Sequence, residues 1–188
     1  MEDAKKAKVV LVGDGMGDEP VAALGGRTVL QAADIPAMRA IAAAGAVHSV
    51  RTFPPGRPAG SDVGNLGLLG YDTTDCYTGR APIEAAGAGV ELGGNEVAFR
   101  CNLVCVRDGR MIDYASGHIT TPEAHELVAA LEQALGRPGL RFHGGVSYRH
   151  LLVWADGAAG VRTTPPHDIT GEPVEAHLPA GEGAEAVR

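Results

Sequence analysis

The predicted strand at 8–12, whose apolar run VVLV ends directly in the glycine-rich stretch GDGMGD, constrains the fold more than any other feature of the sequence. A short aliphatic run without polar alternation is typical of a strand buried on both faces, as in a parallel sheet. A helix is predicted at 35–45, from Pro36 near its start to Gly45 at its end, and the stretch AVHSVRTF behind it alternates like a second strand. Strand, helix and strand in this order predict a parallel crossover unit and an α/β fold.

The pattern changes at about residue 90, where short antiparallel elements are predicted instead. The stretches EVAFRCNLVCV and RMIDYA flank the dipeptide Asp108-Gly109, which is typical of a tight hairpin turn. An amphipathic helix follows in TTPEAHELVAALEQALGR, with a Thr cap and an early Pro122, and it ends at Gly136. The stretch LRFHGGVSYRHLLVWAD predicts another pair of strands, so that these elements together form a small α+β unit.

The two patterns predict a core with an insertion. We expect an incomplete parallel-sheet core at 1–89, an inserted α+β domain at 90–172 and a return to the core at 173–188. A chain of 188 residues that is 45% hydrophobic is long enough to bury a core of this kind. Its 27 glycines and 12 prolines favour turns and mixed α/β structure over a helical bundle.

Charge and composition exclude several classes of function. The chain has 16 basic and 23 acidic residues, a net charge of −7 and no basic cluster, so nucleic acid is not an expected partner. The mixed-charge N-terminus MEDAKKAK and the short apolar run behind it fit neither a signal peptide nor a membrane span, which predicts a cytoplasmic protein without a membrane partner. The odd number of cysteines favours packed thiols over disulfides, and we expect Cys101 and Cys105 on one face of a strand.

Asp14 lies where the first predicted strand gives way to a loop, and the carboxyl ends of such strands are where α/β proteins bind ligands. Three interpretations are open on the loop alone. The Asp14 carboxylate could bind a metal ion, or the loop could be a simple turn with two solvated acids. The GxGxG spacing from Gly13 to Gly17 could also belong to a dinucleotide loop, although Asp18 stands at the third glycine of that fingerprint.

Ser61 precedes a predicted helix at 62–69 that is rich in glycine for a helix. As the N-cap, its hydroxyl would lie beside free backbone N–H groups and the positive end of the helix dipole, where a phosphoryl group is readily bound; the alternative is an ordinary Ser cap. A serine hydroxyl needs a base or a metal to act as a nucleophile, which favours a site formed by Asp14 and Ser61 together, and no GxSxG elbow supports acyl transfer. Gly64 and Gly67 would let the helix lie close to a strand or a substrate.

Three arginines stand in apolar or glycine-rich contexts rather than in charge runs: Arg80 in YTGRAP, Arg100 in AFRCN and Arg149 in SYRH. Arginines in such contexts often bind carboxylate or phosphate through the planar guanidinium group. Each is equally well explained by an ion pair with one of the 23 acidic residues. His150 and His167 show no metal-ligand spacing, and packed or solvated histidines are expected there.

Five stretches, in this order, carry a resemblance to a known family: LVGDGMGDEP, PAGSDVGNLGLLGYD, YTGRAPIEAAG, VAFRCNLV and TTPPHDITGEPV. Over nearly the whole chain they resemble the N-terminal half of the archaeal-type cofactor-independent phosphoglycerate mutases, members of the alkaline phosphatase superfamily. The resemblance implies an alkaline-phosphatase-like parallel-sheet core. It also implies an enzyme that interconverts 3-phosphoglycerate and 2-phosphoglycerate through a phosphoserine at Ser61, without 2,3-bisphosphoglycerate.

The resemblance also implies roles for the residues singled out above. Asp14 and Ser61 would be ligands of a two-metal site for manganese, zinc or magnesium, and Arg80, Arg149 and Arg100 would bind the phosphate and carboxylate of a small phosphorylated metabolite. The inserted domain would cover the substrate and exclude water, which separates a mutase from a phosphatase. Phosphotransfer on another phosphomonoester, such as homoserine phosphate, and binding of phosphorylated metabolites without turnover are the alternatives.

Two departures from the family pattern qualify the resemblance. The stretch IPAMRAI stands where many relatives carry a TPNLD-like helix start, and most metal ligands of the superfamily come from the second half of a longer chain. A parallel core without that half would leave a sheet edge and apolar surface exposed. We therefore expect the 188-residue chain alone to be poorly stable, to form homo-oligomers or to need its missing half.

Overall fold

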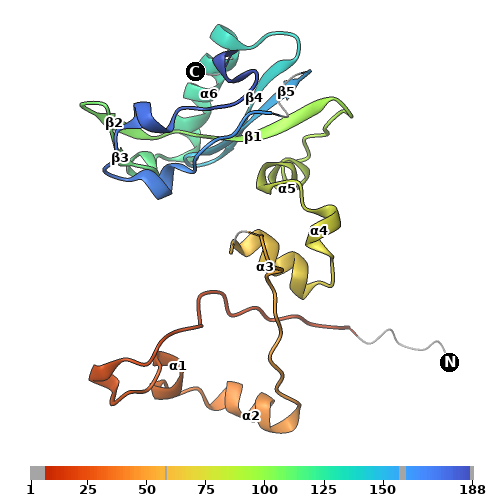
Figure 1. Cartoon of the computed structure of the whole chain (residues 1–188), viewed down its shortest axis with the longest axis vertical. Helices are drawn as coiled ribbons and strands as arrows, with labels where there is room; N and C mark the ends of the chain where they lie inside the picture. The colour runs from red at the N-terminus through yellow and green to blue at the C-terminus, as the bar shows by residue number, and fades with distance from the viewer. Residues whose placement is uncertain (1–6, 58, 157–159, 187–188) are drawn as a thin grey trace, which may run out of the picture. The chain divides into compact units, whose positions relative to one another are not determined.

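The computed structural model describes residues 7–57, 59–156 and 160–186 and shows a mixed α/β chain with a small antiparallel sheet (Figure 1). Residues 1–6, which contribute to the prediction that no signal peptide is present, lie outside the described residues. Within the described ranges, no helix is both long enough and apolar enough to cross a membrane. The chain divides into two compact units between Tyr77 and Thr78.

The first unit, Met1–Tyr77, consists of short helices joined by extended chain. Its elements are η1 (Ala22–Leu24), α1 (Val29–Ala32), α2 (Pro36–Ala44), α3 (Ser61–Leu68) and α4 (Thr73–Cys76). α2 confirms the helix predicted at 35–45: Pro36 opens it, where a missing N–H costs nothing, and Gly45 is its C-cap. α1 begins at a capping box in which Thr28 and Gln31 each accept a hydrogen bond from the other's backbone N–H.

The strands predicted at 8–12 and in AVHSVRTF are wrong, because both stretches are extended but pair with no strand among the described residues. Their side chains face solvent, with exposed fractions of 86% at Val9, 90% at Leu11 and 78% at Val47. A strand is stabilised by ladder hydrogen bonds to its neighbours and does not form from its own residues alone. The aliphatic pattern therefore marks segments that could join a sheet, but the described residues of this unit provide no other strand to pair with them. The parallel-sheet core remains a prediction.

The second unit, Thr78–Arg188, is built on a three-stranded antiparallel sheet in the order β1-β5-β4, with a separate two-stranded hairpin of β2 and β3. The strands are β1 (Glu96–Asn102), β2 (Cys105–Arg107), β3 (Arg110–Asp113), β4 (Leu140–Val146) and β5 (Arg149–Ala155). β4 and β5 confirm the strand pair predicted in LRFHGGVSYRHLLVWAD. Short 3-10 turns complete the unit at η2 (Ser116–His118), η3 (Pro166–Ile169), η4 (Val174–His177) and η5 (Ala184–Ala186).

The hairpin turn at Asp108-Gly109 is confirmed, with φ angles of 49° and 71° that match the twist of the flanking strands. The strand before it is shorter than the sequence indicates, because EVAFRCNLVCV breaks after Asn102 and its first part pairs with β5. The prediction that Cys101 and Cys105 share one face of a strand is therefore wrong. Cys101 lies half-buried in β1, where burial raises the pKa of its thiol, whereas Cys105 is exposed in β2.

Two helices cover the sheet of the second unit: α5 (Arg80–Gly87) contacts β1, and α6 (Thr121–Leu135) contacts β4. α6 is the predicted helix, with Pro122 in its first turn and a capping box between Thr120 and Glu123. The buried alanines of α5 pack against β1 and β5 in a cluster of Ala81, Ala85, Ala98 and Leu151. α5 therefore belongs with the sheet, although it lies before the domain boundary predicted at residue 90.

Candidate functional site

The first candidate site joins α3 to the loop at Asp14, within the unit Met1–Tyr77. Ser61 is the first residue of α3 and Gly60, in extended conformation, is its N-cap, so the prediction of Ser61 as the cap is wrong by one position. The Ser61 hydroxyl donates a hydrogen bond to Asp14 Oδ2 at 3.2 Å instead of accepting one from the helix backbone. The structure thus brings together the two residues that the sequence analysis singled out, 47 positions apart.

The surroundings of this pair are open to solvent. Asp14 and Ser61 are both exposed, and Asp14 lies in a turn where Gly15 has a φ of 72°. Beside Asp14 is an open hollow of about 430 Å³, lined by aliphatic residues of the extended segment, by α3 and by the C-cap of α3. A small ligand could therefore reach the serine hydroxyl without any movement of the chain around it.

The glycines of α3 are explained by a close approach of the backbone. A Cβ at Gly67 would stand 2.8 Å from the Thr52 carbonyl oxygen, and a Cβ at Gly64 would stand 3.1 Å from the ring of Phe53. Side chains at these positions would push the helix away from residues 52–53. We predicted that these glycines let the helix lie close to a strand or a substrate; the structure shows the close approach, but to residues 52–53, which form no strand.

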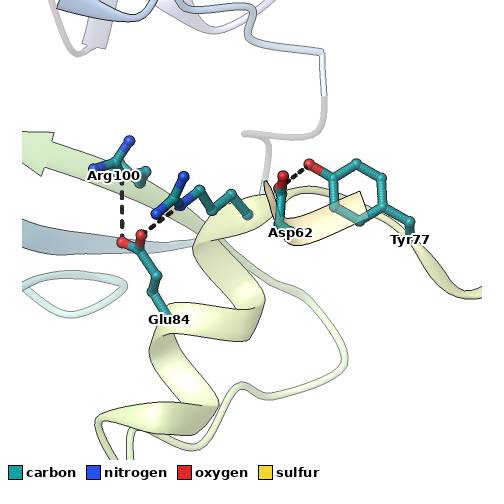
Figure 2. A network of polar contacts seen from close by, with 5 residues as sticks. Asp62, Tyr77, Glu84 and Arg100 are labelled. Atoms are coloured by element: carbon teal, nitrogen blue, oxygen red, sulfur yellow. Dashed lines mark hydrogen bonds and ion pairs between the residues drawn. The ribbon is translucent and has the colours of Figure 1, made fainter. Parts of the chain in front are cut away.

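A second polar contact anchors the first turn of α3, and the sequence analysis missed it. The Tyr77 hydroxyl donates to Asp62 Oδ2 at 2.5 Å, as Figure 2 shows. Asp62 also lies at the positive end of the helix dipole, where a carboxylate is stabilising. Arg57 reaches the same region, with its guanidinium 5.8 Å from the centre of the Tyr77 ring and a hydrogen bond to the Thr74 carbonyl oxygen. No spacing rule predicts this contact, because Asp62 and Tyr77 lie in different elements.

A metal ion at the first site would find two oxygen ligands. The Asp14 carboxylate and the Ser61 hydroxyl are hard donors of the kind that magnesium and manganese prefer. Among the residues that the structure describes, no group of three or more His, Cys, Asp or Glu side chains is placed to hold a metal ion. The described pair therefore fits part of a coordination shell and not a complete site.

The second candidate site lies within the unit Thr78–Arg188, where two of the three predicted arginines meet one carboxylate. Arg80 Nε donates to Glu84 Oε1 at 2.8 Å, and Arg100 Nε donates to Glu84 Oε2 at 3.2 Å. Figure 2 shows Arg100 reaching Glu84 from the strand while Glu84 projects from α5. The ion pairs that the sequence analysis offered as an alternative are therefore present, and they converge on a residue that it did not single out.

Arg80 and Arg100 both line a cavity of about 700 Å³. Its walls are the first turn of α5, the strand β1, and residues 161–166. Asn102 also lines it, and the side-chain oxygen of Asn102 is buried without a hydrogen-bond partner in the described structure. The acidic residue on the wall, Glu96, is paired with Arg141 at 2.6 Å, so the unbalanced charge of the cavity is positive.

Arg149 and the histidines lie elsewhere in the second unit. Arg149 is exposed at the start of β5, with its guanidinium 5.8 Å from the centre of the Tyr148 ring, and it is not part of the cavity wall. His150 is packed, as expected, and its Nδ1 accepts a hydrogen bond from the Gly145 N–H at 3.0 Å. Burial, and to a lesser extent the neighbouring His125, lowers the pKa of His150. His167 is exposed beside Asp168.

These features define an α/β protein with a serine–carboxylate pair in one unit and a cationic cavity in the other. Residues 42–188 match the model of the 2,3-bisphosphoglycerate-independent phosphoglycerate mutase family. Because this match covers most of the chain, the chain belongs to that family.

Individual relatives agree with this membership. A 2,3-bisphosphoglycerate-independent phosphoglycerate mutase of Methanosarcina barkeri is 53% identical, over 92% of this chain and 44% of that protein. One of Methanothermobacter thermautotrophicus is 53% identical, over 96% of this chain and 45% of that protein. The solved structure of the PH0037 protein from Pyrococcus horikoshii covers 75% of this chain and 35% of that chain, with a TM-score of 0.60 and 30% identity. The chain thus spans less than half the length of these relatives.

Proposed function

We propose that this chain supplies the phosphate-accepting serine of a mutase that interconverts 3-phosphoglycerate and 2-phosphoglycerate without 2,3-bisphosphoglycerate. The observation that carries the proposal is the hydrogen bond between Ser61 and Asp14 in a chain of this family. A serine becomes a nucleophile when a neighbouring group removes or attracts its hydroxyl proton. Here the Ser61 hydroxyl donates its hydrogen bond to Asp14 Oδ2, so Asp14 is the group placed to take that proton. Phosphoryl transfer in the cytoplasm to and from a small metabolite is the reaction that this pair suits best.

The proposed chemistry has two balanced halves. In the first, Ser61 Oγ forms a bond to the phosphorus of 3-phosphoglycerate, the serine proton passes along its hydrogen bond to Asp14, and the bond from phosphorus to the glycerate O3 breaks as O3 takes up a proton from solvent. In the second, the 2-hydroxyl of the same glycerate attacks the phosphoserine and gives up its proton to solvent, the bond from phosphorus to Ser61 Oγ breaks, and Oγ regains the proton held by Asp14. No water molecule attacks the phosphoserine, so the product is an isomer of the substrate.

Asp14 and Ser61 would also serve as ligands of a two-metal site for manganese, zinc or magnesium. Further ligands would have to come from outside the described residues, which offer no complete set. When bound, the ions would favour the deprotonated serine and offset negative charge on the transferred phosphoryl group. The carboxylate and hydroxyl oxygens of the pair support this part of the proposal.

Arg80 and Arg100 would bind the anionic groups of the substrate, and their place on a positively charged cavity wall supports this role. Arg149 is proposed as a third substrate ligand on the resemblance alone, because it lies outside that wall. The inserted domain at 90–172 would cover the substrate and exclude water during transfer. A homo-oligomer would be one way to cover the exposed aliphatic side chains of the first unit.

The test is intact-protein mass after incubation with manganese and 3-phosphoglycerate. The wild-type chain is expected to gain the mass of one phosphoryl group, and Ser61→Ala is expected to gain none. Ser49→Ala is the matched control, because Ser49 is an exposed serine of the same unit. The same three proteins are also tested in a chain extended to the length of the relatives. If only the extended chain is phosphorylated, the 188-residue chain lacks metal ligands; if neither is phosphorylated, Ser61 is not the nucleophile. If Ser61→Ala in that longer chain still gains the phosphoryl mass, the proposal is wrong.

The same incubations identify the substrate. Products from 3-phosphoglycerate, homoserine phosphate and other phosphorylated acids would be separated and quantified. We expect 2-phosphoglycerate from 3-phosphoglycerate and no transfer with homoserine phosphate. Binding of 3-phosphoglycerate without turnover in the longer chain would instead favour a protein that only binds phosphorylated metabolites.

A further inference from the structure

Glu84 holds two guanidinium groups at once, and this arrangement suggests a role beyond an ion pair. One carboxylate oxygen accepts from Arg80 and the other from Arg100, with N–O distances of 2.8 and 3.2 Å. Arg80 lies one helical turn before Glu84 on α5, whereas Arg100 comes from β1. The exposed fraction of the Glu84 side chain is 26%, and that of Arg100 is 22%. Glu84 therefore fixes the side chain of a strand residue relative to the start of a helix.

The geometry of these contacts leaves the ends of both arginines available. Each arginine uses Nε for Glu84, and within 7–57, 59–156 and 160–186 neither makes a hydrogen bond through its terminal Nη atoms. A guanidinium has five N–H donors, so four remain on each group. Both arginines line the 700 Å³ cavity, whereas Glu84 is not part of its wall. The carboxylate thus contacts each arginine at Nε and leaves the Nη donors free for a ligand.

One residue of the cavity wall carries an acceptor that lacks a donor. The Asn102 side-chain oxygen is buried and unpartnered in the described structure, and Asn102 lies two residues from Arg100 on β1 and on the same face of the strand. Because this oxygen has almost no accessible surface, a ligand hydroxyl could pair with it only after the Asn102 side chain moves. The wall as it stands complements a ligand with an anionic group for the two guanidinium groups.

We propose that Glu84 is a positioning residue that orients Arg80 and Arg100 to bind the phosphate or carboxylate of a phosphorylated hydroxy acid. The identity of that acid as phosphoglycerate rests on the proposed function, but the role of Glu84 does not. Glu84 acts through the two arginines and does not contact the ligand. Preorganised guanidinium groups bind an oxyanion better than mobile ones, because less side-chain entropy is lost on binding.

Positioning and simple electrostatics predict opposite results for Glu84→Gln. The substitution removes a negative charge beside two cations, which by Coulomb attraction alone would strengthen anion binding. If Glu84 orients the arginines, the loss of one strong acceptor frees Arg80 or Arg100 and weakens binding. Glu91→Gln is the matched control, because Glu91 is an exposed acidic residue of the same unit and the charge change is the same.

The experiment is calorimetric titration of the 188-residue chain with 3-phosphoglycerate and, separately, with inorganic phosphate, in a Ser61→Ala background that blocks transfer. We expect Glu84→Gln to raise Kd for 3-phosphoglycerate by at least about 10-fold, the effect of about one charge-assisted hydrogen bond. Glu91→Gln should change Kd by less than about twofold, as expected for an exposed charge that is not part of the cavity wall and pairs with neither arginine. Glu84→Asp, which keeps the charge but shortens the side chain, should also weaken binding.

A double-mutant cycle shows whether Glu84 acts through Arg100. With Arg100→Lys, the further change Glu84→Gln should cost much less than it costs alone, because the group it orients is already lost. Circular dichroism verifies that each variant keeps the wild-type spectrum, and Glu84→Asp replaces Glu84→Gln if the latter unfolds. The proposal would be overturned if a folded Glu84→Gln variant bound 3-phosphoglycerate as tightly as wild type or more tightly. It would also be overturned if the affinity losses of Glu84→Gln and Arg100→Lys simply added in the double variant, or if the wild-type chain bound neither 3-phosphoglycerate nor inorganic phosphate. A chain that binds 3-phosphoglycerate in this way but is never phosphorylated at full family length would overturn the proposed function and leave the role of Glu84 standing.

Discussion

The units Met1–Tyr77 and Thr78–Arg188 use their aliphatic residues in opposite ways. In the second unit, β1 and β5 bury Ala98 and Leu151 against α5, and Val153 of β5 is also fully buried. In the first, aliphatic side chains such as Val9 and Leu11 are largely exposed, and among residues 7–57 and 59–77 the fully buried side chains are those of Val63 and Thr73. Every strand of the second unit has a partner in the same unit, and the predicted strands of the first have none among the described residues. An aliphatic sequence becomes a core only where its hydrogen-bonding partners are present.

The helices of the first unit show that this difference concerns strands in particular. α2 and α3 form where the sequence predicts helices, because each helix satisfies its backbone groups within itself. The Ser61–Asp14 contact also forms in this unit, although the segment 8–12 has no sheet around it. The first unit thus holds its candidate nucleophile on a helix and by a hydrogen bond to a loop distant in sequence, without a sheet, whereas the second holds Arg80 and Arg100 on a helix and a strand that pack together.

Hydrogen exchange should give the largest contrast between the units. The amides of β5 lie in the centre of the sheet and should exchange at least about 10³-fold more slowly than the amides of 8–12, which have no ladder partners. Exchange measured by mass spectrometry on peptic fragments reports both regions in one sample. Slow exchange of the 8–12 amides in a monomeric chain would mean that this segment is hydrogen-bonded to another strand. The two units would then not differ in strand pairing.

The same substitution in each unit should give a large difference in stability. Val153→Ala removes two methyl groups from a fully buried site in β5 and should cost about 2 kcal/mol of unfolding free energy. Val47→Ala, at a side chain that is 78% exposed, should cost less than about 0.5 kcal/mol. Urea denaturation followed by the fluorescence of Trp154, the single tryptophan, measures the second unit, and far-UV circular dichroism of the same samples also reports the helices of the first unit, where Val47 lies. Equal costs would show that Val47 is buried in solution, for example in an oligomer.

Two helix glycines provide a comparison of intermediate size. Gly87→Ala in α5 meets no atom within 4 Å and should stabilise the helix by up to about 1 kcal/mol. Gly67→Ala in α3 has the same intrinsic benefit, but its Cβ would stand 2.8 Å from the Thr52 carbonyl oxygen, and the net effect should be a loss of about 1 kcal/mol. Exchange rates of the α3 and α5 amides measure both effects. A slower exchange of α3 in Gly67→Ala would show that residues 52–53 do not pack against it.

The pH dependence of stability should show the smallest effect, and it should arise in the second unit. Burial lowers the pKa of His150 below its usual value of 6.5, so the unfolded chain takes up a proton that the folded chain does not. The stabilisation of the folded state by neutral His150 is fully present above pH 6.5, the usual pKa of histidine. It is lost as the pH falls from 6.5 towards the lowered pKa of His150 in the folded chain. Unfolding free energies at about pH 7.5 and about pH 5.5 should differ more in wild type than in His150→Gln.

The neighbours of His150 in this titration are His125 of α6, the Gly145 N–H of β4, the backbone of Ser147 and Cys101, its partner on β1. His48→Gln, at an exposed histidine of the first unit, is the control and should leave the pH dependence unchanged. A pH dependence that survives His150→Gln in full would assign the effect to another group.

The sequence predicted the helices α2 and α6 and the hairpin turn well. Pro36 and Gly45 bound α2, the capping box at Thr120 opens α6, and Asp108-Gly109 turns the hairpin, because each depends on backbone groups a few positions apart. Asp14 and Ser61 were paired on chemical grounds, and the structure places them in contact. The N-cap assignment failed by one residue because the Ser61 hydroxyl is engaged by a carboxylate distant in sequence.

Only the tertiary structure decided which distant groups meet. The alternation in EVAFRCNLVCV fits one long strand, but pairing with β5 ends β1 at Asn102. Arg80 and Arg100 were each recognisable from their context, but their common partner Glu84 depends on α5 packing against β1. The sequence by itself therefore determined helices, turns and candidate chemistry, which depend on neighbours along the chain. Strand pairing and charge partners depend on neighbours in space, and an aliphatic run such as 9–12 has the pattern of a strand but forms one only beside another strand.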